Sequence, residues 1–448
     1  MSGLAELIKN LGHGVSGSDV KRSEATDRLT RQGIQVHVGH DARFVGDAEM
    51  LVVSAAVPST NAEIIEAHRR LIPVIPRSEI LAELMCRKYG IAVAGAHGKT
   101  STSSMIAILL ERAGLDPTVV VGGYLSAFGS SARLGQSKYM VVEADESDRT
   151  FLKLSPTIAV ITNIDHEHLE TFGSFENLRQ AFLDFANKVP LSGTVVVSVD
   201  DPHIRELVPQ IERRVITYGL DTKNSDFTAN DLLLEPFGVK CQVSSSYASF
   251  GIQLSKQLHL NVPGRHNLSN ALAAIAVGFE LGIEFDQAVV GLSDFRGVTR
   301  RFQLVGEVRG VMVVDDYGHH PTEIQVVLET ARASFCRRII LVFQPHRYTR
   351  TRDLRSELGR SLAAADEVVL TNVYGAGEES IPGATVDSIA EVVKKASSAP
   401  VHVVRSIEDV AQTVVDISRP GDLILTMGAG SIDTVAAEIL EILQSESQ

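Results

Sequence analysis

The chain has 448 residues, 44% of them hydrophobic and 22% charged, which is the ordinary balance of a globular protein. Its net charge of −13 argues against nucleic acid as a partner, because a nucleic-acid-binding surface needs a basic face. The three cysteines are far apart, which indicates neither a disulfide framework nor a zinc site and is typical of a reducing, cytoplasmic location. No apolar run reaches the ~18 residues of a membrane span and no export leader is seen, so we expect no membrane partner.

The length predicts two to four domains, and the first elements indicate a small Rossmann-like α/β domain over residues 1–89. Residues 1–11 have the apolar spacing of a helix, and a short strand over 14–17 leads to Asp19. This order is the second half of a βαβ unit, in which Asp19 stands where such domains bind a ribose. We therefore expect the first strand of the unit, with its glycine-rich turn, to precede residue 1.

A candidate phosphate-binding loop follows this domain. Residues 91–94 are an apolar run typical of a buried parallel strand, and a helical run follows the segment Gly95-Ala96-His97-Gly98-Lys99-Thr100-Ser101. The N–H groups of such a loop face a triphosphate, the lysine reaches the β- and γ-phosphates, and the hydroxyl of Thr100 or Ser101 can hold Mg²⁺. The loop is two residues shorter than the usual G-x-x-x-x-G-K-[ST]. The alternative is a purely structural turn, which the Lys-Thr pair after Gly98 disfavours.

The next two predicted strands also end in polar residues. The strand over 139–143 runs into the acidic cluster Glu143-Ala-Asp-Glu-Ser-Asp148, and the strand over 157–163 is followed by Asp165-His-Glu-His168. A carboxylate at a strand end beside a phosphate loop commonly holds Mg²⁺. The histidines could instead lie in a solvated turn. We favour a metal or phosphate contact, because consecutive parallel strands place their polar ends on one rim of the sheet.

The rest of the sequence predicts two further regions. Residues 90–298 form a central domain in which short alternating segments between 215 and 262 indicate a small antiparallel section, and Asn267 is expected to cap the helix that follows. Residues 299–448 contain four apolar strands, each followed by a polar loop, and form a second Rossmann-like domain. A loop with Arg347, Arg350 and Arg352 lies beside His346. A charge run is usually a solvated face, but at a strand end arginine forks favour binding of a carboxylate or phosphate.

Seven motifs, in this order along the chain, resemble those of the Mur ligases. They are Gly95-Ala-His-Gly-Lys-Thr100, Glu143-Ala-Asp-Glu-Ser-Asp148, Thr162-Asn163 with His168, Gly264-Arg-His-Asn267 with Asn270, Arg300-Arg-Phe302, Asp315-Asp-Tyr-Gly-His-His-Pro-Thr-Glu323 and Phe343-Gln-Pro-His-Arg-Tyr-Thr-Arg-Thr351. Each motif alone is weak evidence, but the set covers essentially the whole chain. The resemblance implies a three-domain α/β fold: a Rossmann-like domain, a central phosphate-loop domain with a small antiparallel section, and a C-terminal Rossmann-like domain.

The resemblance implies an ATP-dependent ligase of peptidoglycan synthesis with UDP-N-acetylmuramate and L-alanine as substrates. In such enzymes the sugar-nucleotide carboxylate attacks the γ-phosphate of ATP, and the amine then displaces phosphate from the acyl phosphate. By the same resemblance, Mg²⁺ would be held by Thr100, Glu143 and His168. His266 and Asn270 would contact the adenine, and Arg301 would contact the ATP phosphates. L-Alanine or the substrate carboxylate would be held by His346, Arg347 and Arg350, with Asp316 near the amine.

Three alternatives and some departures from the family pattern stay open. Family members have a first strand and a Gly-Ile-Gly-Gly-x-Gly-Met-Ser-Gly turn that this sequence lacks, and Ala96 and Glu167 replace the common Thr and Asp. A ligase that adds a whole tripeptide is disfavoured by the His-Arg-Tyr-Thr-Arg run of residues 346–350. A phosphate-loop kinase or GTPase would lack the arginine loop of the third domain, and the Asn-Lys-x-Asp motif of guanine specificity is absent from this sequence. A nucleotide-binding protein without ligase activity is the third alternative, and the sequence gives no oligomeric state.

Overall fold

The computed structural model describes residues 1–54, 57–125, 128–222, 224–247 and 254–445. The chain forms two compact units. The first consists of Met1–Leu232, Cys241–Leu260 and Asn267–Phe295, and the second of Leu233–Lys240, Asn261–His266 and Arg296–Gln448. Within the described residues, no helix is both long enough and apolar enough to cross a membrane.

The first unit begins with alternating short helices and strands, which confirms the predicted α/β character of this region. They are α1 (Ser2–Asn10), β1 (Ser16–Asp19), α2 (Glu24–Arg31), β2 (Gln35–Val38), β3 (Leu51–Val53), α3 (Ala62–Arg69), β4 (Val74–Pro76) and α4 (Arg77–Cys86). The strands form two separate parallel pairs, β1 with β2 and β3 with β4. On α1, the apolar Leu4 and Leu7 are buried in the same core cluster as residues of the large sheet described next.

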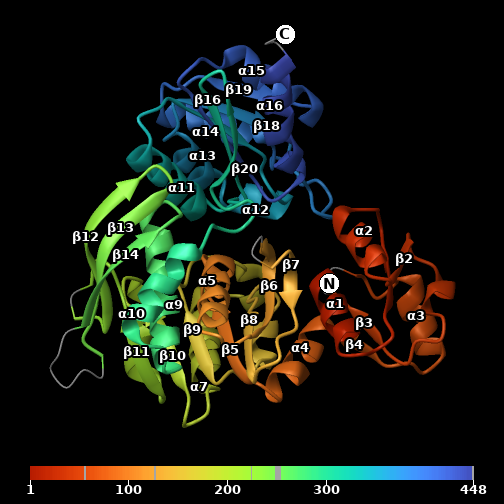
Figure 1. Cartoon of the computed structure of the whole chain (residues 1–448). Helices are drawn as coiled ribbons and strands as arrows, with labels where there is room; N and C mark the ends of the chain where they lie inside the picture. The colour runs from red at the N-terminus through yellow and green to blue at the C-terminus, as the bar shows by residue number, and fades with distance from the viewer. Residues whose placement is uncertain (55–56, 126–127, 223, 248–253, 446–448) are drawn as a thin grey trace. The chain divides into compact units, whose positions relative to one another are not determined.

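A ten-stranded sheet organises the rest of the first unit, in the order β14-β13-β12-β11-β10-β9-β5-β8-β6-β7 (Figure 1). Its strands are β5 (Tyr89–Ala94), β6 (Thr118–Leu125), β7 (Ser130–Arg133), β8 (Tyr139–Glu143), β9 (Ile158–Ile161), β10 (Thr194–Ser198), β11 (Arg214–Tyr218), β12 (Phe227–Glu235), β13 (Gly238–Ser245) and β14 (Leu254–Leu260). Its main helices are α5 (Lys99–Arg112), α7 (Phe175–Asn187) and α9 (Arg265–Glu280).

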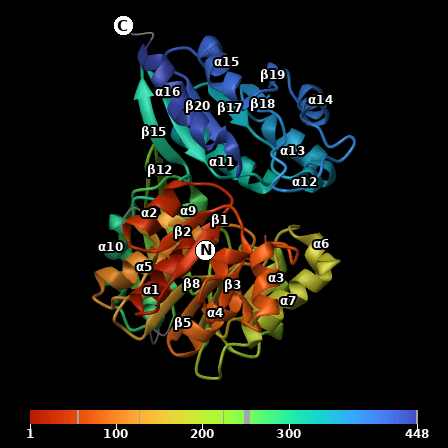
Figure 2. The ribbon, with the colours of Figure 1, turned by 90° about the vertical axis from the view of Figure 1, so that its right-hand side faces the viewer.

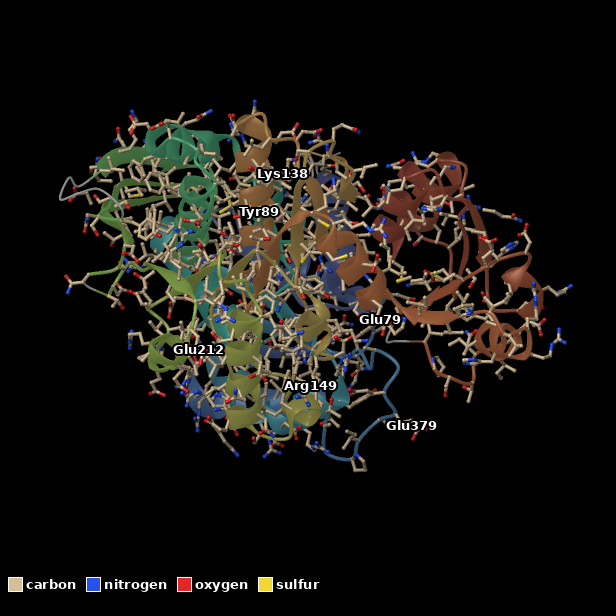
Figure 3. The ribbon with its side chains drawn as sticks, turned by 90° about the horizontal axis from the view of Figure 1, so that it is seen from below. Glu79, Tyr89, Lys138, Arg149, Glu212 and Glu379 are labelled. Atoms are coloured by element: carbon tan, nitrogen blue, oxygen red, sulfur yellow. The ribbon has the colours of Figure 1, made fainter. Side chains whose placement is uncertain are left out.

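The central strand β5 pairs in parallel with β8 on one side and β9 on the other. Residues 91–94 have no exposed surface, because both faces of the sheet are covered, and this explains their unbroken apolar run. Parallel strands end at the same edge, so the loops after β5, β8 and β9 meet there. At the opposite edge, where β5 and β8 begin, the Lys138 ammonium lies over the rings of Tyr89 and Tyr139. Figure 3 labels Lys138 and Tyr89.

Two local expectations for this region are wrong. Strand β11 pairs in parallel with β10, so the region predicted to be antiparallel from residue 215 begins with a parallel strand. The hairpin comes later, at β12 and β13, which only two residues connect. Asn267 does not cap its helix, because α9 already begins at Arg265 and Asn267 lies buried in the first turn.

The second unit is a doubly wound α/β layer structure (Figure 2). Its sheet has the order β15-β16-β20-β17-β18-β19 and carries helices on both faces. The strands are β15 (Gln303–Val308), β16 (Val311–Asp316), β17 (Ile339–Phe343), β18 (Glu367–Thr371), β19 (Val401–Val404) and β20 (Leu423–Met427). One face packs on α11 (Pro321–Ser334), α13 (Arg355–Leu362) and α14 (Val386–Ala396), the other on α15 (Val410–Ile417) and α16 (Val435–Ser445). The four strands predicted from sequence are confirmed, and β15 and β19 at the edges are additional.

Candidate active site

The loop between β5 and α5 has a backbone that only glycine adopts without strain at two positions. Gly95 has φ 135° and Gly98 has φ 79°. A Cβ atom on Gly95 would lie 2.1 Å from Oγ1 of Thr162, and one on Gly98 would lie 2.7 Å from Oδ1 of Asn270. The two glycines of the sequence motif are therefore explained by the close approach of β9 and α9 to the loop.

Side chains at the end of β9 hold this short loop in place. The N–H of His97 donates to Oδ1 of Asn163 at 2.8 Å, and Oγ1 of Thr162 donates to the carbonyl of His97 at 2.6 Å. The N–H of Ala96 donates to the Asn163 carbonyl at 3.1 Å. The ring of His97 contacts Oδ2 of Asp165 through Nε2 at 2.9 Å. These hydrogen bonds fix the conformation of the loop, and His97 contributes to them with both its backbone and its ring.

Lys99 is the first residue of α5, and its ammonium points back into the loop. Nζ donates to the carbonyls of Gly95 and Ala96 at 2.7 and 3.0 Å and to Oε1 of Glu146 at 2.8 Å. Burial opposes the charge on Lys99, but the carboxylates of Glu146, Asp145 and Glu143 outweigh it, so the pKa of Lys99 is raised. Lys99 therefore stays a cation in a loop whose form suits phosphate binding.

Glu143, at the end of β8, lies next to the phosphate loop. Its Oε1 accepts a hydrogen bond from Oγ1 of Thr100 at 3.0 Å, and its Oε2 accepts one from the N–H of Gly122 at 2.6 Å. Ser101 is buried beside Thr100 in the first turn of α5. His168 lies at the start of a short helix, with Nε2 3.8 Å from Oε1 of Glu146. The hydroxyl of Thr100, the carboxylate of Glu143 and the imidazole of His168 are donor types that suit a divalent cation.

The second unit brings together three other predicted residues. Burial, aided by the positive charge of Arg301, lowers the pKa of His266 to about 4, and its Nδ1 lies 3.5 Å from Oγ1 of Thr330. The guanidinium of Arg301 lies 5.3 Å from the centre of the Tyr317 ring and 3.6 Å from Glu323. Burial raises the pKa of Asp316 to about 6 although Arg301 opposes the rise.

The carboxylate of Asp316 makes two backbone contacts. Oδ2 accepts the N–H of Phe302 and Oδ1 accepts the N–H of Gly318, each at 2.7 Å. Both oxygens thereby fix the chain around Arg301, whose neighbour Arg300 is held by Asp315 at 2.8 Å. A role of Asp316 toward an amine stays a prediction.

The arginine segment after β17 is partly helical and not the loop expected from sequence. Arg350 and Arg352 lie on α12 (Tyr348–Asp353), and Arg347 caps it with the unusual φ of 68°. Nη1 of Arg350 lies 3.3 Å from Nδ1 of His346, whose ring stacks on Tyr374. Arg352 pairs with its exposed neighbour Asp353 and is separate from this group.

Burial, together with nearby positive charge, keeps the imidazole of His346 neutral. Burial lowers the pKa of His346 to about 4, and the nearby His319, Arg350 and Arg347 add to the effect. Glu378 fixes the start of α12 by accepting the N–H and Oγ1 of Thr349 at 3.0 and 2.8 Å. The cluster therefore offers two arginine cations beside an uncharged imidazole, which suits a carboxylate ligand.

The structure thus gathers the predicted residues in separate groups. The first unit unites Lys99, Thr100, Glu143, His168 and Asn270, and the second contains the groups around Arg301 and around His346. The sequence analysis missed Gly122, Glu146, Asn163 and Glu378 as contributors. The sequence analysis identified the acidic motif and the Thr-Asn pair after β9, but it did not predict which residues they contact.

Three family descriptions match consecutive parts of the chain. They are "Mur ligase family, catalytic domain" over residues 1–89, "Mur ligase middle domain" over 93–278 and "Mur ligase, glutamate ligase domain" over 300–430. The chain belongs to the Mur ligase family.

Relatives of this Mur ligase match along its whole length. The UDP-N-acetylmuramate–L-alanine ligase of Geotalea daltonii is 47% identical over 99% of this chain and 96% of its own. That of Solibacter usitatus is 49% identical over 100% and 94%. Among solved structures, the UDP-N-acetylmuramate–alanine ligase of Thermotoga maritima is 30% identical with a TM-score of 0.84, covering 100% of this chain and 97% of its own. A murein peptide ligase from Psychrobacter arcticus has a TM-score of 0.73 at 24% identity, covers 99% of this chain and 96% of its own, and so supports the fold alone.

Proposed function

We propose that this Mur ligase joins L-alanine to UDP-N-acetylmuramate with hydrolysis of ATP, through an acyl phosphate, in peptidoglycan synthesis. The observation that carries the proposal is the match, at 47 to 49% identity over at least 99% of the chain, with relatives that bear this name. The buried, charged Lys99 in a glycine cradle supports it, because a transferring phosphoryl group needs a fixed cation.

In the first unit, the residues act on the phosphates of ATP. Loop N–H groups and the start of α5 bind anionic oxygens, and Lys99 offsets the charge that develops as the carboxylate attacks the γ-phosphorus. Thr100, Glu143 and His168 would hold Mg²⁺, which would supply further charge neutralisation when bound. Asn270, packed on Gly98, would contact the adenine together with His266.

In the second unit, the residues act on the other reactants. Arg301 would bind ATP phosphates, and its side chain is oriented by Tyr317 and Glu323. Arg347, Arg350 and His346 would hold the carboxylate of L-alanine or of the sugar nucleotide. A carboxylate bound to guanidinium groups leaves the amine end of the amino acid available for attack on the acyl phosphate, and Asp316 would lie near that amine.

The same proposal covers the domain division and the location. Residues 1–89 would bind the UDP-sugar, residues 90–298 ATP and residues 299–448 the amino acid. The three family matches divide the chain at similar positions, which supports the boundaries. A cytoplasmic location is proposed because the three cysteines are free thiols and the substrates are those of a cytoplasmic biosynthetic step.

The experiment is a phosphate-release assay on the full-length protein with Mg²⁺-ATP. We expect release to require both UDP-N-acetylmuramate and L-alanine, and to fall by at least ~10³-fold in Lys99→Ala with the fold intact by circular dichroism. Release that needs a tripeptide in place of L-alanine would favour the recycling type of ligase. Release with neither substrate, or unchanged release in Lys99→Ala, would refute the proposal.

A further inference from the structure

Glu146 is a buried carboxylate to which the proposed reaction gives no task. It follows β8 in the acidic segment, and its side chain is 3% exposed. Oε1 accepts a hydrogen bond from Lys99 at 2.8 Å, whereas Oε2 is buried and receives no hydrogen bond from any described residue. Burial raises the pKa of Glu146, and Lys99 limits the rise. A buried carboxylate bonded through one oxygen is unfavourable and requires an explanation.

The contacts of Lys99 show what Glu146 does in this structure. An ammonium group has three N–H donors. Those of Lys99 have three acceptors within hydrogen-bond distance, namely the carbonyls of Gly95 and Ala96 and Oε1 of Glu146. A phosphate oxygen that receives a hydrogen bond from this ammonium must therefore displace one of the three.

Of these acceptors, the carboxylate is the one that can move. Hydrogen bonds from Ala96 and His97 to Asn163 fix the loop that carries the two carbonyls. The neighbouring carboxylate of Glu143 is also fixed, because each of its oxygens has its own donor. Glu146 has rotatable side-chain bonds, and within the described part of the chain Lys99, the group that a phosphate would bind, is the one side chain that donates a hydrogen bond to it.

We propose that Glu146 is a positioning residue that holds the Lys99 ammonium in the phosphate loop and releases it to the terminal phosphates of the nucleotide. The inference rests on the proposed function, since it assumes that ATP binds at this loop. Exchange of one anion for another keeps Lys99 paired at every stage. Separating Lys99 from Glu146 then opposes nucleotide binding, so Glu146 weakens the affinity for ATP while it stabilises the protein without nucleotide.

Calorimetric titration of the full chain with Mg²⁺-ATP and with AMP tests this exchange. Glu146→Gln removes the charge, and Glu146→Asp keeps the charge but shortens the side chain and breaks the 2.8 Å contact. The matched control is Asp148→Asn, which removes one charge from an exposed residue of the same segment. We expect both Glu146 variants to bind ATP about tenfold more tightly. Their AMP affinity should be unchanged, because AMP lacks the β- and γ-phosphates, and Asp148→Asn should match the wild type with both nucleotides.

Thermal melting supplies the second measurement. Both Glu146 variants should melt below the wild type without nucleotide and close to it with saturating Mg²⁺-ATP. Unchanged or weaker ATP binding, or an equal loss of melting temperature with and without ATP, would overturn the exchange. If Glu146→Gln bound ATP more tightly and Glu146→Asp did not, the cause would be charge repulsion between Glu146 and ATP, and the exchange would be overturned too. If Glu146→Gln does not fold, Glu146→Asp decides. A wild type that binds no ATP would instead contradict the proposed function.

Discussion

Arg350 contacts His346, whereas Arg352, two residues along the same helix, pairs with Asp353 at the surface. If Arg350 binds a carboxylate through two N–H groups of its planar guanidinium, a lysine at this position cannot reproduce the paired hydrogen bonds. We expect Arg350→Lys to raise the KM for L-alanine or the sugar nucleotide about tenfold or more, with little change in the KM for ATP. Arg352→Lys is the control and should behave as the wild type. A selective ATP defect in Arg350→Lys would assign this cluster to the nucleotide.

His266 makes the second unit sensitive to acid. Its pKa falls from 6.5 to about 4 on folding, so below pH 6.5 the unfolded chain binds the proton and the folded chain does not. Stability therefore falls as the pH drops from 6.5 to about 4, by at most about 2 kcal/mol between pH 7 and pH 5. His266→Gln should lose this part of the pH dependence.

The measurement is the free energy of urea unfolding at pH 7 and pH 5. Hydrogen exchange in peptides from β17 serves as the probe, because this buried strand belongs to the same unit as His266. His68→Gln, on an exposed position of α3, is the control and should keep the pH dependence of the wild type. An equal pH dependence in wild type and His266→Gln would show that His266 is not the responsible group.

At the scale of elements, strand β6 positions the proposed metal ligand Glu143. A Cβ atom on Gly122 would lie 2.9 Å from both carboxylate oxygens of Glu143, and the Gly122 N–H donates to one of them. Gly122→Ala should displace the carboxylate and raise the Mg²⁺ concentration for half-maximal phosphate release about tenfold, as loss of a group that orients a ligand typically does. Gly14→Ala, where a Cβ would meet nothing within 4 Å, should leave the magnesium dependence unchanged. A folded Gly122→Ala protein with the wild-type magnesium dependence would remove this role of β6.

The sequence predicted the buried elements well and the edges poorly. Strand β17 is wholly buried and β5 is buried after its first residue, and both appear in the sequence as apolar runs. The missed strands β15 and β19 lie at the two edges of their sheet, and all of their residues are partly buried or exposed. Edge strands bury less apolar surface, so their sequences carry a weaker pattern. α12 was missed because its polar, arginine-rich sequence carries no apolar period.

The site could be predicted where its chemistry is local in sequence. The phosphate loop places seven residues in one contiguous motif, and the resemblance to a family added the metal and arginine positions. Glu146 and Asn163 were not predicted as contributors, because their contacts with Lys99 and His97 join residues 47 and 66 positions apart. Such pairs depend on the order of strands in the sheet, which the apolar pattern alone does not specify.

At the scale of the whole molecule, the two compact units are interleaved along the chain. The backbone passes from one unit to the other after residues 232, 240, 260, 266 and 295. No single cut therefore separates the units, and a fragment that starts at Arg296 lacks two segments of the second unit. The division into three domains stays a prediction, since it concerns function as much as compactness.

This interleaving has a consequence for synthesis on the ribosome. Phe237, at the turn between β12 and β13, belongs to the second unit and packs edge-on against Phe335 at a ring distance of 5.2 Å. When Phe237 emerges, its partner has not yet been translated. At about 5–20 residues per second, the nascent chain must wait roughly 5–20 s before Phe335 follows. During that interval an aromatic ring on a hairpin tip is accessible to chaperones, so the order of translation sets a period of vulnerability that the finished molecule no longer has.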